Sequence, residues 1–235
     1  MRTIGLLGGM SWESTVPYYQ TINRVVRERL GGLHSARIVL YSVDFHEIER
    51  LQHESRWAEA AKLLLDAARL VEGAGADFLV LCTNTMHKVA PSIEAGIGIP
   101  LLHIADATGT RIAAAGFATI GLLGTRFTME EAFYRERLER RHGLTVLTPS
   151  PDEREAVHRV IYDELCLGTI RDASRSRYRG IVEGLVARGA QAIVLGCTEI
   201  GMLLRPGDVS VPLFDTAKIH AEEAALRAVE REFAE

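Results

Sequence analysis

The sequence has little of what nucleic-acid-binding, membrane-spanning and secreted proteins need. Its 235 residues carry a net charge of −4, so no basic surplus exists to follow a phosphate backbone or an anionic membrane surface. Its apolar runs are shorter than the ~20 residues that a membrane-spanning helix requires. The first residues reach Trp12 and Glu13 without the apolar segment of a secretory signal. We therefore expect a cytoplasmic protein that acts on a small molecule, with no nucleic-acid or membrane partner.

Cysteine and lysine are also scarce. The three cysteines are Cys82, Cys166 and Cys197, and they lack the paired spacing of a zinc site. None of the three lysines, Lys62, Lys88 and Lys218, has a setting that suits a Schiff base. The histidines His46, His103 and His220 are scattered along the chain, and His87 is interpreted as a buried histidine rather than a ligand or base. We therefore expect reduced thiols, no bound metal and no lysine-linked cofactor.

The composition is that of a globular protein, with 47% hydrophobic and 25% charged residues. Short apolar runs alternate with amphipathic stretches, which predicts an α/β fold with parallel strands. The predicted strands are Ile4–Leu7, Ile38–Val43, Phe78–Leu81, Ile99–His103, Ala118–Leu123, Ala192–Leu195 and Val211–Phe214. The predicted helices are Ser14–Leu30, Trp57–Val71, Met129–Arg141, Val157–Ala187 with an interruption near Gly168, and Ala217–Phe233.

The two halves of the chain repeat one another in three places. Ile-Gly-Leu-Leu-Gly-Gly from Ile4 matches Ile-Gly-Leu-Leu-Gly-Thr from Ile120 at five of six positions. A Cys-Thr pair follows each match, at Cys82 and at Cys197, 77 and 76 positions after the first glycine of the match. A third echo follows, in which Ile-Pro-Leu-Leu-His corresponds to Val-Pro-Leu-Phe-Asp. The repeats predict two pseudo-symmetric lobes, each a parallel sheet with helices on both faces.

Each Cys-Thr pair comes directly after a predicted strand. Ligands of open α/β sheets bind outside the carboxyl ends of the strands. We therefore expect the active site to lie in the cleft between the lobes, with one thiol on each face of a bound molecule. Such a geometry removes a proton from one side of a carbon and returns one on the other side, which is the chemistry of a racemase or epimerase.

Four segments, distributed over nearly the whole chain, share a pattern with a known family. They are Ile-Gly-Leu-Leu-Gly-Gly-Met-Ser-Trp-Glu-Ser from Ile4, Ser-Val-Asp-Phe-His-Glu-Ile from Ser42, Leu-Cys-Thr-Asn-Thr-Met-His-Lys up to Lys88, and Gly-Cys-Thr-Glu-Ile up to Ile200. They resemble the aspartate/glutamate racemase family, in its aspartate-racemase branch. The resemblance implies a pyridoxal-phosphate-independent racemase of two α/β lobes that forms a homodimer. It also implies that the final helix returns to the first lobe, so lobe 1 would be 1–104 with 215–235 and lobe 2 would be 105–214.

The resemblance implies that Cys82 and Cys197 are the acid/base pair for the α-proton of aspartate or glutamate, without a cofactor. An ordinary thiol, with a pKa of ~8.5, becomes a useful base when nearby donors or a helix N-terminus stabilise the thiolate. The residues beside the cysteines and at the ends of the opposing first strands are expected to bind the substrate. They are Gly8, Gly9, Met10, Thr83, Asn84, Thr85, Thr125, Thr198 and Glu199. Glu199 is expected to bind the substrate ammonium or to orient a donor.

One segment departs from the family pattern. Some aspartate-specific members carry a lysine just before the glycine that corresponds to Gly168, where it contacts the side-chain carboxylate of the substrate. Here the segment is Glu-Leu-Cys-Leu-Gly, with Cys166 in place of a cation. Arg50 and Arg126 are the expected substitutes, because they are close to the family's site segments in the sequence, and Cys166 is interpreted as structural.

Several further functions remain open from the sequence. Hydantoin racemases, maleate isomerases and arylmalonate decarboxylases share the lobes and one or both cysteines. Decarboxylation needs one thiol as proton donor, so two intact Cys-Thr pairs favour racemisation, whereas only the aspartate-type flanks count against maleate isomerisation. The alternative from a different class is a non-catalytic protein that closes on an acidic amino acid. Replacing Cys82 by Ser would leave such binding intact but would abolish racemisation.

Overall fold

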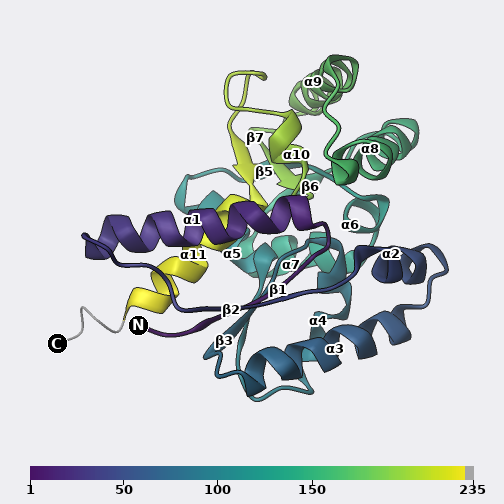
Figure 1. Ribbon diagram of the computed structural model, residues 1–235. Helices are drawn as coiled ribbons and strands as arrows, with labels where there is room; N and C mark the ends of the chain where they lie inside the picture. Colours follow the sequence, from purple (N-terminus) through teal and green to yellow (C-terminus); the bar gives the residue numbers. More distant parts are fainter. Residues whose placement is uncertain (231–235) are drawn as a thin grey trace. The chain divides into compact units, whose positions relative to one another are not determined.

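The computed structural model describes residues 1–230, in which strands and helices alternate (Figure 1). The strands are β1 (Ile4–Gly8), β2 (Ile38–Ser42), β3 (Phe78–Leu81), β4 (Leu101–Leu102), β5 (Thr119–Gly124), β6 (Thr145–Leu147), β7 (Ala192–Gly196) and β8 (Leu213–Asp215). The α-helices are α1 (Trp12–Leu30), α2 (Phe45–His53), α3 (Trp57–Gly73), α4 (Ala90–Glu94), α5 (Ile104–Ala114), α6 (Arg126–Glu130), α7 (Ala132–His142), α8 (Pro151–Asp163), α9 (Asp172–Ala187), α10 (Ile200–Leu203) and α11 (Thr216–Val229). Two 3-10 helices are η1 (Thr85–Val89) and η2 (Leu165–Leu167).

The described chain packs into two compact units. Unit 1 comprises Met1–Ile104 and the described residues after Ile219, and unit 2 comprises Ala105–Ile219. The chain therefore leaves unit 1 directly after Ile104 and returns to it within α11.

Unit 1 contains a parallel sheet with the strand order β2-β1-β3-β4. Strands β1 and β3 are buried along their whole length, which explains why their sequences are continuous apolar runs rather than alternating ones. Helix α3 packs on one side of this sheet, and α1 and α11 lie on the other (Figure 1). Tyr18 of α1 donates a hydrogen bond to His220 of α11 over 3.0 Å. The guanidinium of Arg227 on α11 lies 5.2 Å from the centroid of the Phe78 ring in β3.

Unit 2 repeats this architecture with the parallel strand order β6-β5-β7-β8. Strand β7 is fully buried, and helices α8 and α9 pack on one another and on β5. The hydroxyl of Tyr178 on α9 donates to the Val157 carbonyl of α8 over 3.0 Å. Asp106 of α5 accepts two hydrogen bonds of 2.6 Å from Arg137 of α7. The predicted fold class is therefore confirmed, since both units are parallel α/β structures with the same strand order.

Several elements differ from those predicted from sequence. Strand β6 and helices α2 and α5 were not predicted, because β6 is a three-residue edge strand, α2 is only nine residues long and α5 has few large apolar residues. The helix predicted over Met129–Arg141 is divided between α6 and α7, because Glu131 is extended, with φ of −87° and ψ of 153°. Helix α8 begins at Pro151, where Ser150 and Glu153 form a capping box.

The last predicted helix extended to Phe233, and its end lies outside the described residues. Within residues 1–230, no helix combines the length and the apolar character needed to cross a membrane.

Candidate active site

In unit 1 the segments that follow β1 and β3 lie side by side, because these strands are neighbours in the sheet. Leu7 pairs with Leu81, and the Cys82 N–H donates to the Leu7 carbonyl over 2.9 Å. Gly9 follows β1 with φ of 90°, and a Cβ at this position would clash with the backbone of Val43. Met10 comes next and is buried. The structure thus brings the predicted residues at the ends of β1 and β3 together within unit 1.

Cys82 lies directly after β3 and is completely buried. Its Sγ donates to the Val80 carbonyl over 3.6 Å, and burial raises the pKa of the thiol well above its ordinary value. The three polar residues that follow are also buried; they are Thr83, Asn84 and Thr85. The segment forms a tight turn in which the Thr83 N–H donates to the Leu81 carbonyl over 2.8 Å. The buried Cys82 thiol is therefore followed directly by three short, buried polar side chains.

His87 holds this turn from η1. Its Nε2 accepts a hydrogen bond of 3.2 Å from the Ile104 N–H, and its Nδ1 lies 2.7 Å from the Thr83 carbonyl oxygen. Because Nε2 accepts, the proton of the neutral imidazole lies on Nδ1, which donates to Thr83. His87 is buried, as the sequence analysis expected.

Two histidines that are scattered in the sequence lie beside His87 in the fold. The ring centroids of His103 and His220 are 4.3 Å and 6.0 Å from that of His87. His220 Nε2 donates to the Leu102 carbonyl over 2.8 Å, and burial lowers the His220 pKa to about 4. In the part of the chain that the structure describes, no group of three or more His, Cys, Asp or Glu side chains is arranged to hold a metal ion.

In unit 2 the corresponding segments follow β5 and β7. Gly124 pairs with Gly196 at the ends of these strands, and Thr125 caps α6 by accepting from the Thr128 N–H over 3.3 Å. A Cβ on Gly196 would lie 2.7 Å from a methyl carbon of Leu122 and 2.9 Å from a carbonyl oxygen, which is too close for any side chain. Glycine is therefore required where the two strand ends approach.

Cys197 and Thr198 both donate hydrogen bonds to the buried carboxylate of Glu199. Cys197 Sγ donates to Glu199 Oε2 over 3.0 Å, and the Thr198 hydroxyl donates to the same oxygen over 2.8 Å. Burial raises the pKa of the Cys197 thiol well above its ordinary value, and the nearby charges of Glu199 and Cys166 raise it further. A base is thus in direct contact with Cys197, whereas Cys82 contacts a backbone carbonyl.

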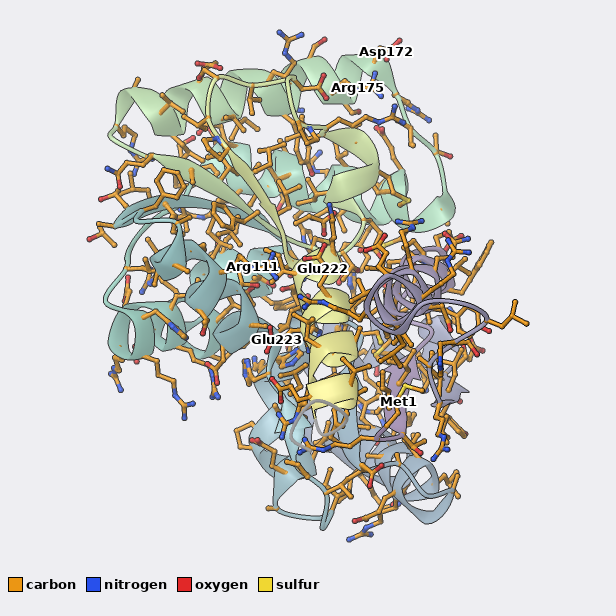
Figure 2. All side chains as sticks on the ribbon, turned by 90° about the vertical axis from the view of Figure 1, so that its left-hand side faces the viewer. Met1, Arg111, Asp172, Arg175, Glu222 and Glu223 are labelled. Carbon is orange, nitrogen blue, oxygen red and sulfur yellow. The ribbon has the colours of Figure 1, made fainter. Side chains whose placement is uncertain are left out.

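Helix α10, which follows Glu199, is held by α9. The Nε of Arg175 donates to the Leu203 carbonyl at the end of α10 over 2.9 Å. The same guanidinium pairs with Asp172 in the first turn of α9, and Figure 2 shows these two side chains together. The Arg175 contact therefore holds the C-terminal end of the segment that follows Cys197.

The two cysteines are not quite equivalent in their own sheets. Gly5 pairs with Leu79 in unit 1, and its repeat counterpart Gly121 pairs with Ile193 in unit 2. Three residues farther along each strand stand Cys82 and Gly196, so Cys197 lies one residue beyond the position that corresponds to Cys82.

Three further residues were singled out from the sequence, namely Arg126, Arg50 and Cys166. Arg126 directly follows Thr125 and lies 3.9 Å from Glu155, whereas Arg50 is exposed on α2. Cys166 lies on η2, which packs against α10, and its charge acts on Cys197. This proximity of Cys166 to Cys197 has no local sequence signal, because it depends on the packing of segments whose cysteines are 31 positions apart.

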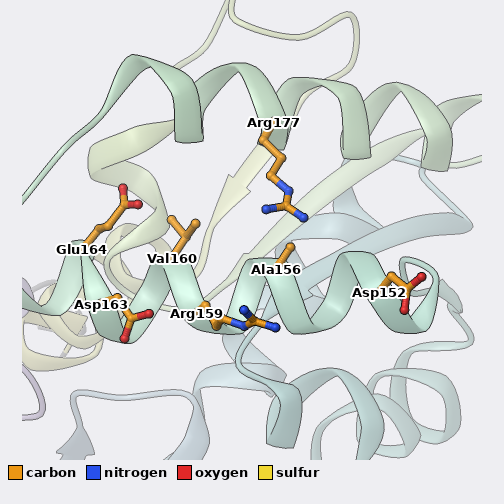
Figure 3. A pocket seen from close by; sticks show the side chains of 7 residues that line it. All are labelled: Asp152, Ala156, Arg159, Val160, Asp163, Glu164 and Arg177. Atoms are coloured by element: carbon orange, nitrogen blue, oxygen red, sulfur yellow. The ribbon is translucent and has the colours of Figure 1, made fainter.

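A separate surface pocket of about 230 Å³ lies in unit 2 between α8 and α9 (Figure 3). Arg177 points from α9 toward Ala156 of α8 (Figure 3). The residues that line the pocket are Asp152, Ala156, Arg159, Val160, Asp163, Glu164 and Arg177. None of the predicted site residues lines this pocket.

Comparison with known proteins places this geometry in a family. The family model of the Asp/Glu/hydantoin racemases matches residues 7–224. The chain is 58% identical to a candidate Asp/Glu racemase from Yersinia pestis of known crystal structure, with a TM-score of 0.90 over 97% of this chain and 100% of that chain.

Two further relatives have lower identity over nearly the same length. An aspartate racemase homologue from Pyrococcus horikoshii OT3 is 33% identical, with a TM-score of 0.83 over 97% of this chain and 99% of that chain. The broad specificity amino-acid racemase RacX of Bacillus subtilis (strain 168) is 22% identical over 226 residues, which cover 91% of this chain and 92% of RacX.

Proposed function

The chain belongs to the Asp/Glu/hydantoin racemase family, and we propose that it interconverts the L and D forms of aspartate or glutamate without a cofactor. Family membership supports racemisation, and the relatives described as an Asp/Glu racemase candidate and an aspartate racemase homologue support an acidic substrate. One observation carries the two-thiol part of the proposal. In each unit a Cys-Thr pair directly follows the strand that is paired with the first strand of that unit, at Cys82 and at Cys197.

In the proposed reaction the two thiols act on opposite faces of the substrate α-carbon. The thiol of Cys197 passes its proton to Glu199, and the resulting thiolate removes the α-proton from one face. The thiol of Cys82 donates its proton to the other face, which gives the opposite enantiomer. The roles of the two cysteines reverse for the other enantiomer. Each positioned acid or base contributes a factor of ~10²–10⁴ to the rate.

The substrate itself makes the thiolate accessible in this scheme. Burial raises the pKa of both thiols when no ligand is present. A bound ammonium group adds positive charge beside the sulfur atoms and so lowers their pKa values. We therefore expect a bound substrate to favour the thiolate form of each cysteine.

The polar groups beside the cysteines are suited to hold the amino-acid backbone of the substrate. Side-chain hydroxyls and an amide come from Thr83, Asn84, Thr85 and Thr198, and backbone N–H groups come from Met10 and Thr125. The Gly9 N–H donates to the Thr15 hydroxyl over 2.9 Å, so Gly9 contributes close backbone approach instead. We propose Arg126 as the cation for the side-chain carboxylate, because it directly follows Thr125. The homodimer implied by the resemblance, which light scattering tests, and the cytoplasmic location expected from the sequence remain predictions.

The test is proton NMR of L- and D-aspartate and of L- and D-glutamate in D₂O, with no added cofactor. We expect the α-proton signal to disappear and the opposite enantiomer to form. Cys82→Ser and Cys197→Ser should each abolish inversion, whereas Cys166→Ser, the matched control, should retain it. Absence of exchange with every acidic amino acid would reject the acidic-substrate proposal.

A broader substrate range is the second candidate. The segment around Cys166 supplies no cation for a substrate side chain, and RacX, a relative over 91% of this chain, is a broad specificity amino-acid racemase. The same experiment with alanine, serine, lysine and methionine distinguishes the two candidates. Turnover of maleate would instead favour a maleate isomerase, and exchange of hydantoins would favour a hydantoin racemase. Binding of an acidic amino acid without any exchange would favour a non-catalytic binding protein.

A further inference from the structure

The imidazole of His87 joins two backbone groups that are far apart in the sequence. One is the carbonyl of Thr83 in the turn that carries Cys82, at 2.7 Å from Nδ1. The other is the N–H of Ile104, at 3.2 Å from Nε2. Ile104 is the last residue of unit 1 before the chain enters unit 2. His87 therefore ties the Cys82 turn to the point where the chain leaves the unit.

Both contacts require one protonation state and one tautomer. Nε2 accepts, so it carries no proton, and Nδ1 donates. A doubly protonated ring would lose the Ile104 contact, because both of its nitrogens would be donors. The ring is buried, so water does not readily replace either partner.

Two further histidines lie beside His87. His103 follows β4, with its ring 4.3 Å from that of His87. His220 on α11 has its ring at 6.0 Å and is itself bonded to Tyr18 of α1. On η1, the ammonium of Lys88 lies over the Trp57 ring at 3.8 Å.

Unit 2 orders its cysteine segment in a different way. There the side chain of Glu199 binds Cys197 and Thr198 directly. The residues five positions after Gly196 and Cys197 are Gly201 and Met202, and neither side chain has a polar hydrogen to donate. His87, five positions after Cys82, thus has no counterpart in the other half of the repeat.

We propose that His87 is a positioning residue that fixes the Cys82 turn by bridging the Thr83 carbonyl to the Ile104 N–H. The geometric part of the proposal rests on unit 1 alone, and its consequence for catalysis rests on the proposed racemase function. Without the bridge, the Thr83 carbonyl is left buried without this donor, and the turn opens more often. Cys82 then becomes accessible more often and is misplaced for proton transfer.

The first readout is the alkylation rate of each cysteine in the native protein, measured by mass spectrometry with iodoacetamide. Cys82 is fully buried, so its alkylation reports local opening of the turn. We expect His87→Ala to accelerate alkylation of Cys82 by about tenfold or more, while Cys166 and Cys197 change by less than about twofold. The matched control is His220→Gln, which alters a buried histidine of the same cluster that bonds to Leu102 and Tyr18 instead.

Two conservative variants separate the two contacts. The side-chain nitrogen of Asn reaches the place of Nδ1, so His87→Asn keeps the donor to Thr83. The end of Gln reaches the place of Nε2, so His87→Gln keeps only the acceptor for Ile104. We expect both variants to accelerate alkylation of Cys82 relative to wild type, because each one keeps a single contact and breaks the bridge. If His87→Ala does not fold, the alkylation rates of the Asn and Gln variants still test the bridge.

The second readout is the D₂O exchange experiment with both enantiomers. We expect His87→Ala to lower kcat for inversion by about tenfold or more, and to leave exchange without inversion for one enantiomer, as in Cys82→Ser. Equal acceleration of all three cysteines, or a wild-type rate of Cys82 alkylation in the Asn or the Gln variant, would overturn the bridge. Full inversion by His87→Ala would overturn its role in catalysis. If the wild-type protein exchanges no substrate, the proposed function fails, and the alkylation rates still decide whether the bridge exists.

Discussion

The Cys197 thiol donates a hydrogen bond to the carboxylate of Glu199 over 3.0 Å, and this pair is buried at the end of β7. Cys82 instead donates to a backbone carbonyl, that of Val80. The two thiols therefore differ in their access to a base, although they belong to repeated sequence segments. In the proposed reaction this difference makes Glu199 the proton acceptor for one thiol only.

Replacing Glu199 by Gln tests this role. Glu199→Gln keeps a hydrogen-bond acceptor for Cys197 but removes the base, so we expect kcat for racemisation to fall by a factor of ~10²–10⁴. Steady-state kinetics with each enantiomer measure the loss. The matched control is Glu183→Gln on the surface of α9, where the carboxylate accepts a hydrogen bond from Ser210. A Glu199→Gln enzyme as fast as the control would show that Cys197 loses its proton elsewhere.

His220 is expected to make the protein less stable in mild acid. Burial lowers its pKa from 6.5 to about 4, so below pH 6.5 the unfolded chain binds a proton that the folded chain does not. The stability from this group is complete above pH 6.5 and is lost as the pH falls toward 4. Over that range the loss is on the order of 3 kcal/mol.

Urea unfolding at pH 7.5 and pH 5.0 measures the effect of His220. Between these pH values the wild-type protein should lose about 2 kcal/mol more unfolding free energy than His220→Gln, which has no titratable group at this position. Equal losses in the two proteins would show that His220 is not the group responsible.

Two arginines of α7, Arg137 and Arg140, should contribute unequally to the unfolding free energy, because only Arg137 pairs with Asp106. Burial alone would raise the pKa of Asp106, but Arg137 and Arg141 hold it below its ordinary value. Arg137→Ala should lower the unfolding free energy by about 1–3 kcal/mol, because a half-buried carboxylate loses two hydrogen bonds of 2.6 Å. Arg140→Ala removes only an exposed pair with Glu136 and should cost about 0.5 kcal/mol or less. Thermal melts of both variants provide the comparison, and equal costs would contradict it.

Two glycine-to-alanine changes should have opposite signs. A Cβ at Gly196 would meet Leu122 at 2.7 Å, so Gly196→Ala should destabilise the protein by about 1–3 kcal/mol and slow catalysis by moving Cys197. Gly184 lies in α9 with no atom within 4 Å of an added Cβ. Gly184→Ala should therefore stabilise the protein by about 0.5–1 kcal/mol and leave kcat unchanged. Denaturant midpoints and kcat measured on the same preparations test both expectations.

The strands that carry the candidate site were predictable because they are buried on both faces. The sequences of such strands are continuous apolar runs. The runs of β1 and β3 also repeat in the second half of the chain, in β5 and β7. The position of each Cys-Thr pair at a strand end followed from the same runs. The two-unit fold class and the placement of both cysteines within their own sheets could therefore be predicted from the local sequence.

Contacts between distant segments were not predictable in this way. His220 lies beside His87 because α11 returns to unit 1, and no local pattern encodes that return. Strand β6 was missed because three residues at a sheet edge are too few to show a period. The role expected for Glu199, binding an ammonium or orienting a donor, left open the contact with Cys197 that the structure shows.

Strand β7 continues one residue farther than β3, which places Cys197 one step beyond the position that corresponds to Cys82. An enzyme with two unlike proton donors need not treat the two mirror-image substrates alike in turnover or in saturation. The two enantiomers nevertheless have equal free energies in water, so their equilibrium constant is one. The ratio kcat/KM must then be the same in both directions, and any advantage in kcat for one enantiomer must be matched by an equally higher KM.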